Sequence, residues 1–200
     1  MQPTMRSSLL PSVSASLLVL TALSVPAAAQ SRDDWMPTPQ GRLAHATNEL
    51  AKAKTPEERF YALGRAAKES FVVGNVEDAK KYAHELMTLL PNFPSNWNYG
   101  NAVQDANLVL GRVALKEGHV DEAKQYLIAA GNSPGSPQMD SFGPNVSLAK
   151  DLLEKGERDV VIQYLGLCRK FWELESGRLD EWIQEIKDGK IPDFGANLIY

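Results

Sequence analysis

The sequence predicts an all-α protein, a short α-solenoid of antiparallel helix pairs with a leading helix and a C-terminal capping helix. Two observations lead to this prediction. The segment that begins at Gly74 recurs 44 residues later at Gly118, and a further copy follows after another 38 residues, at Gly156. Apolar residues recur every three to four positions on both sides of each glycine, which is the spacing of one helix face. Self-similarity at a period of roughly 20–50 residues is typical of repeat architectures.

The three copies share residue types at equivalent places. The first two copies match over residues 74–82 and 118–126, both of which begin with glycine and end with tyrosine. The second and third copies share Asn107 with Asn145, Leu110 with Leu148, Leu115 with Leu153 and Gln125 with Gln163. A glycine at the end of a helix suits a left-handed cap. Each copy is therefore expected to be two helices joined by a glycine turn.

The repeats are expected to form one domain that spans residues 41–188. Thr55, Pro56 and Glu58 have the spacing of a capping box with proline at the first helical position, so a helix is expected to begin there. The other expected segments are an irregular N-terminal part at 30–40, a leading helix at 43–54, a capping helix at 179–187 and an irregular tail at 189–200, whose apolar end is expected to dock.

These repeats resemble the tetratricopeptide family of helix–turn–helix units. The second copy matches best, with Leu110-Gly111 at the family's Leu-Gly position, Gly118 at its turn, and Ala123 and Ala130 at its small packing positions. The copies lie further apart than the family's period of about 34 residues, so extra residues are expected at 92–100 and 132–144. The resemblance implies stacked helix pairs whose first helices line a concave face. The function that it implies is a non-catalytic protein–protein interaction or scaffold module.

Residues 1–29 have the pattern of a cleavable secretory signal peptide. Arg6 supplies a positive charge, an apolar run follows at residues 9–25, and Ala27 and Ala29 form an A-x-A cleavage site. The apolar run is shorter than the roughly 20 residues of a membrane-spanning helix. No membrane insertion is therefore expected after cleavage, and an uncleaved membrane anchor is the alternative. The mature protein is expected to be exported, either to a bacterial periplasm or as a secreted protein.

Charge and composition give no indication of an enzyme or of a nucleic-acid-binding protein. The formal charge of −4 provides no basic face for nucleic acid. His45, His84 and His119 fall in three different predicted elements, so no metal site is expected, and no cofactor motif is present. Cys168 is the only cysteine, so it cannot form an intramolecular disulfide. We expect no catalysis, with a hydrolase of unrecognised site as one alternative.

Three basic residues are the first candidates for binding a partner. Lys68, Arg112 and Lys150 occupy the same place in the three copies, on the first helix of each. The resemblance places these helices on a concave wall, where three stacked cations could receive an acidic protein segment or peptide. The alternatives are a solvated face and intramolecular pairing with the abundant acids.

The two long inter-repeat segments are the second candidate. Trp97 and Tyr99 lie among polar residues in the first segment, and Met139 and Phe142 lie among turn-forming residues in the second. Long irregular loops in compact domains are often functional. These side chains could contact a peptide, a small molecule or a glycan outside the cytoplasm, or they could instead pack back against neighbouring helices and anchor their loops.

Overall fold

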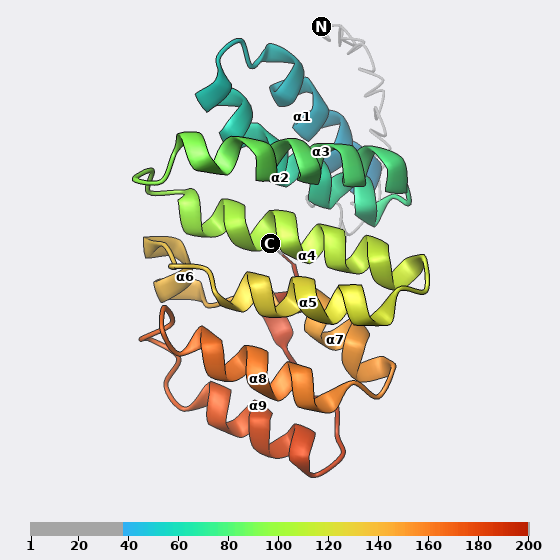
Figure 1. The fold of residues 1–200 in the computed structure, drawn as a ribbon, viewed down its shortest axis with the longest axis vertical. Coiled ribbons are helices and arrows are strands. Elements are labelled where there is room, and N and C mark those ends of the chain that lie inside the picture. The colour runs from blue at the N-terminus through green and yellow to red at the C-terminus, as the bar shows by residue number, and fades with distance from the viewer. Residues whose placement is uncertain (1–37, 200) are drawn as a thin grey trace, which may run out of the picture. The chain divides into compact units, whose positions relative to one another are not determined.

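The computed structural model describes residues 38–199, and within this range the chain is all-helical (Figure 1). Nine α-helices and two short 3-10 helices make up the described part, and no strand occurs in it. The expected signal peptide at 1–29 and most of the expected irregular segment at 30–40 lie outside these residues, as does Tyr200. No helix within residues 38–199 is both long and apolar enough to cross a membrane.

The helices follow one another with short connections. Their bounds are α1 Pro39–Lys52, α2 Pro56–Val72, α3 Val76–Leu89, α4 Tyr99–Lys116, α5 Val120–Gly131, α6 Pro137–Phe142, α7 Ser147–Glu154, α8 Arg158–Cys168 and α9 Arg178–Lys187, with the 3-10 helices η2 Leu90–Asn92 and η3 Gly195–Leu198. The expected leading and capping helices are α1 and α9. The expected helix pairs are α2 with α3, α4 with α5, and α7 with α8.

The same glycine turn joins the two helices of each pair. Gly74, Gly118 and Gly156 all adopt a φ of +87°, in the left-handed region that favours glycine. In each turn the N–H of the next residue donates to the carbonyl five residues earlier, at 2.9 Å (Asn75), 2.8 Å (His119) and 3.0 Å (Glu157). This is the hydrogen bond of a Schellman cap, which satisfies a carbonyl that the helix end leaves unpaired. The repeat seen in the sequence is therefore also a repeat of backbone geometry.

Helix α4 is the centre of the fold. It packs against α2 and α3 on one side and against α5 and α7 on the other (Figure 1). More of its side chains are buried than in any other described helix, including the polar residues Gln104 and Asn107. The first helices α2, α4 and α7 contact one another in order along the stack. We call the surface formed by these three helices the first-helix wall.

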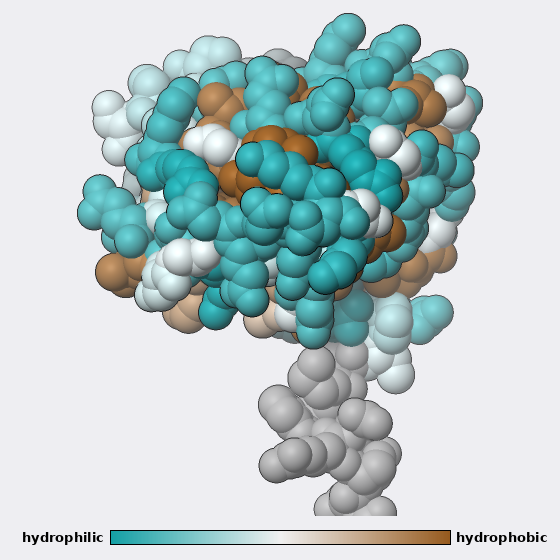
Figure 2. Space-filling model, turned by 90° about the horizontal axis from the view of Figure 1, so that it is seen from below, coloured by the Kyte–Doolittle hydropathy of each residue, from teal (hydrophilic) through white to brown (hydrophobic). Residues whose placement is uncertain are grey.

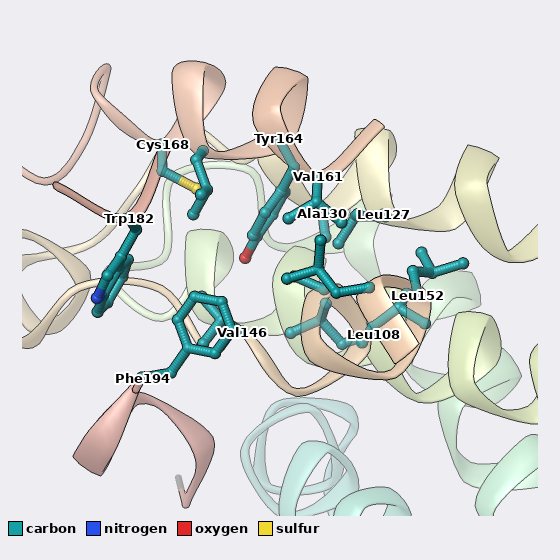
Figure 3. Packing of buried hydrophobic residues seen from close by; sticks show 14 of the residues in the cluster. Leu108, Leu127, Ala130, Val146, Leu152, Val161, Tyr164, Cys168, Trp182 and Phe194 are labelled. Atoms are coloured by element: carbon teal, nitrogen blue, oxygen red, sulfur yellow. The ribbon is translucent and has the colours of Figure 1, made fainter. Parts of the chain in front are cut away.

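The largest hydrophobic cluster joins α4, α5, α7, α8 and α9, as Figure 3 shows around Tyr164 and Val146. Helix α9 closes this cluster with Leu179, Trp182 and Ile186, whereas most of its remaining residues are exposed and polar. The end of the stack at α9 accordingly shows a largely hydrophilic surface, with only scattered apolar residues (Figure 2). A polar outer face is what a terminal capping helix requires.

Three boundaries differ from the prediction. Helix α1 begins at Pro39, before the expected residue 43, because the Thr38 hydroxyl accepts from the Gly41 N–H at 3.1 Å and caps it. The segment expected to be irregular at 132–144 contains the helix α6, which Ser136 caps through the Met139 N–H. The tail at 189–200, also expected to be irregular, contains η3 and docks through Phe194, Asn197 and the half-buried Leu198, whereas Ile199, at the apolar end that was expected to dock, is 76% exposed.

Candidate functional site

The three basic residues on the first-helix wall are all paired with carboxylates of the same chain. The Nζ of Lys68 lies 2.9 Å from Asp105 Oδ1, and the Nε of Arg112 lies 2.7 Å from Asp151 Oδ2. Lys150 pairs with Glu154 one turn further along α7. The alternative of intramolecular pairing is therefore the geometry observed. The first two pairs connect α2 to α4 and α4 to α7, so they bridge neighbouring repeats.

Arg112 makes a second contact that holds it in place. Its guanidinium carbon lies 4.5 Å from the ring centroid of Phe71 on α2, and the Lys116 ammonium lies 5.9 Å from the same ring. A cation over an aromatic face is attracted by the ring quadrupole. With a carboxylate on one side and a ring on the other, Arg112 would have to break two contacts before it could bind a partner.

A second set of ion pairs follows the second helices. Lys80 on α3 pairs with Glu117 at 3.0 Å, and Lys124, its equivalent in the next repeat, pairs with Glu157 at 3.3 Å. The hydrogen bond to Glu117 raises the pKa of Lys80. Each of these lysines therefore reaches the glycine turn of the following repeat. These contacts were not predicted from the sequence, although Lys80 and Lys124 occupy equivalent positions in the repeat.

The second long segment is anchored rather than open. Met139, expected as a surface contact, is only 2% exposed and belongs to the largest hydrophobic cluster. The Ser133 hydroxyl donates to the Gly100 carbonyl at 2.8 Å. A Cβ at Gly100 would lie 1.9 Å from the carbonyl oxygen of Gly135, so only glycine allows this approach. Of the segment's two candidates, only Phe142 is at the surface, at 65% exposure.

The first long segment presents an exposed aromatic pair. Trp97 is 60% exposed and stacks on Tyr61 of α2, with ring centroids 5.9 Å apart and ring planes 28° from parallel. Tyr61 is itself 40% exposed. The Asn96 side chain donates to the Tyr61 hydroxyl at 2.7 Å and to Glu57 Oε1 at 3.2 Å, which fixes the segment on α2. Tyr99, by contrast, is half-buried at the start of α4 and packs on the N-terminal cluster.

An open cleft of about 540 Å³ lies between α1 and α2, and Tyr61 forms part of its wall. The other lining residues are His45, Ala46, Glu49, Lys52, Ala53, Glu58, Ala62 and Arg65. This cleft was not predicted, because no pattern in the sequence shows how α1 packs against α2. Only the capping box that starts α2 was visible, and it places Glu58 at one end of the cleft.

The two glutamates that line this cleft have partners among residues 38–199, whereas Arg65 has none. Glu49 pairs with Lys52 at 2.9 Å. Glu58 accepts from the backbone N–H groups of Lys54 and Thr55, and these bonds lower its pKa. Arg65 is exposed and forms no ion pair or hydrogen bond with any residue in the range 38–199. The cleft therefore holds Arg65, which is unpaired among residues 38–199, and the ring of Tyr61, on which Trp97 stacks.

The three histidines and the cysteine of residues 38–199 lie on different elements. Among residues 38–199, no set of three His, Cys, Asp or Glu side chains lies close enough to hold a metal ion. Cys168 is buried against α9, and burial raises the pKa of its thiol. His45 lies at the cleft on α1, whereas His84 and His119 lie on α3 and in a repeat turn.

No protein-family model, curated protein or solved structure matches the chain.

Proposed function

We propose that this protein is an exported, non-catalytic interaction module of the tetratricopeptide type, and that it binds a protein partner at the cleft between α1 and α2. The observation that carries the proposal is the stack of Trp97 on Tyr61, a wall residue of a cleft that also holds Arg65, which has no ion pair among residues 38–199. Export is proposed from the signal-peptide pattern of residues 1–29.

The repeat geometry supports the family assignment. Three helix pairs share the same glycine turn, and their first helices contact one another in order along the stack. Ala79 and Ala123 are fully buried, at positions where the family's pattern has a close-packing alanine. Helix repeats of this kind bury their apolar faces against neighbouring repeats and present an extended surface to partners.

The chemistry of the cleft favours a protein segment that carries an acidic residue. Trp, Tyr and Arg are the residue types most enriched among the side chains that dominate binding energy at protein interfaces. The three cations of the first-helix wall are paired within the chain, whereas Arg65 can offer its planar donors to a carboxylate. A partner segment with an apolar side chain for the Trp97–Tyr61 rings and a carboxylate for Arg65 fits both features.

Comparative capture tests this proposal. The purified mature protein and its Trp97→Ala and Arg65→Glu variants are used as baits in extracytoplasmic extract from the native source, and the captured proteins are quantified by mass spectrometry. Leu174→Ala is the matched control, since Leu174 is an equally exposed apolar residue that belongs to neither the cleft nor the two long segments. We expect a partner that both cleft variants lose and the control retains. Retention by both cleft variants, or loss in the control, would overturn the proposal.

A small molecule or a glycan in the same cleft is the second candidate. The cleft volume of about 540 Å³ falls within the range of roughly 300–1,000 Å³ that is usual for ligand pockets. The outward face of Trp97 could also stack against a sugar ring. A ligand of this kind would raise the melting temperature of the wild-type protein and not that of the Trp97→Ala variant, with no captured protein in the first experiment.

A further inference from the structure

The first helix of the third repeat is shorter than its counterparts by nine or ten residues, about two and a half turns. Helix α7 has 8 residues, against 17 in α2 and 18 in α4. It begins at Ser147, and residues 143–146 before it are not helical. The backbone groups of this stretch therefore need partners from elsewhere in the chain, because buried backbone donors and acceptors are costly when unpaired.

Gln104 and Tyr164 pair with the Asn145 backbone, and Asn197, in the C-terminal tail, supplies further partners. Its side-chain amide donates to the carbonyls of Phe142 and Pro144, at 3.0 and 2.9 Å. Its own carbonyl accepts from the Val146 N–H at 2.9 Å. Asn197 is only 2% exposed, so these hydrogen bonds form away from water. One residue of the tail thus pairs with three backbone groups, two through its side-chain amide and one through its backbone carbonyl.

The tail adds an aromatic anchor three residues earlier. Phe194 is 2% exposed and packs edge-to-face on Trp182 of α9, with ring centroids 5.0 Å apart. Figure 3 shows Phe194 beside Val146 and facing the cluster that Trp182 closes. We call the surface that receives the tail, formed by Phe142, Pro144, Val146 and Trp182, the tail cradle.

We propose that residues 190–199 are a built-in ligand of the tail cradle, and that the cradle is a second, closed binding site. It takes a protein segment with an aromatic residue three positions before an asparagine, once the chain's own tail is released. This site differs from the cleft between α1 and α2 and uses neither Trp97 nor Arg65. The two sites can therefore be tested separately.

The tail is bound in the manner of a docked peptide. Only part of it is buried, and Ile191, Ala196 and Ile199 are exposed. Its single regular element is the four-residue η3. Segments with few buried contacts open at a lower free energy than the helices they cover. The indole N–H of Trp172, whose ring lies 5.7 Å from that of Trp182, is buried and has no acceptor among residues 38–199.

Peptide binding in trans tests the proposal. The probe is a fluorescently labelled synthetic peptide of residues 190–199. Its affinity is measured by anisotropy for the wild-type protein and for the Phe194→Ala/Asn197→Ala double variant. An occupied site lowers the apparent affinity by the fraction of molecules in which it is open. We expect the variant to bind the peptide at least about tenfold more tightly than the wild type does. The same peptide with alanine at the position of Asn197 should lose that binding, and adding Trp97→Ala to the protein should not change it.

Equal binding by wild type and variant, or binding of both peptides alike, would overturn the proposal.

Hydrogen exchange of the wild-type protein provides a second test that does not require the variant to fold. The Val146 amide, which is bonded to the tail, should exchange faster than the buried Leu165 amide of α8, through opening of the tail alone. If both amides exchange at one rate, through unfolding of the whole domain, the tail is a fixed part of the core and not a releasable ligand.

Discussion

The Lys68 ammonium on α2 lies 2.9 Å from the Asp105 carboxylate on α4, and this ion pair joins the first two repeats of the first-helix wall. Its side chains are 30% and 19% exposed, so water screens the pair only in part. We predict that a double-mutant cycle of Lys68→Ala and Asp105→Ala gives a favourable coupling energy of about 0.2–1 kcal/mol in urea unfolding. Strictly additive single variants would show that the pair does not stabilise the stack.

The glycine turns lead to a second prediction. Gly118 has a φ of +87°, and a Cβ there would meet no atom within 4 Å, so any cost of Gly118→Ala comes from the backbone. We expect a loss of about 1–2 kcal/mol in the free energy of unfolding. Gly166 is the matched control. A Cβ there would also meet no atom within 4 Å, but Gly166 lies inside helix α8 and not in a turn. Gly166→Ala should instead stabilise the protein, by about 0.5–1 kcal/mol. Equal effects of the two substitutions would contradict the turn geometry.

The sequence predicted those elements that depend on local spacing. The apolar period and the glycines predicted α2 to α5 and α8, because helix faces and left-handed caps depend on residues close together in the sequence. The unwound start of α7 was not predicted, since Asn197 stabilises it from 53 residues away along the chain. The pairing and burial of the candidate site residues also depend on residues distant in the sequence, so the sequence did not predict them. Whether Lys68 is free or paired depends on Asp105 of the next repeat, and the burial of Met139 depends on how its whole segment folds against α4.

The buried thiol leads to a third prediction. Burial raises the pKa of Cys168 far above its ordinary value of 9.0, so the folded state holds the proton more tightly than the unfolded state does. The resulting stability is present below about pH 9 and is lost as the pH rises further. We expect Cys168 to react with a thiol reagent at neutral pH only at the rate of unfolding. Denaturant should accelerate labelling in parallel with loss of helical circular dichroism, and rapid labelling of the native protein would contradict the burial.

Export leads to a fourth prediction, which concerns residues outside the described range. Cleavage after Ala29 should give a mature protein that begins at Gln30. Intact mass and N-terminal sequencing of the protein from the extracytoplasmic fraction measure this directly. Material that keeps residues 1–29 and is recovered with the membrane fraction would instead indicate an uncleaved anchor.

Site-specific photo-crosslinking in cells is the most direct test of the central claim, that the cleft between α1 and α2 is the open partner site. The amino acid p-benzoylphenylalanine is placed at position 97, and at the exposed position 163 on α8 as the control. We predict a discrete crosslinked adduct from position 97 that disappears when Arg65→Glu is added, and no such adduct from position 163. The absence of an adduct at position 97, or the same adduct from both positions, would contradict the claim.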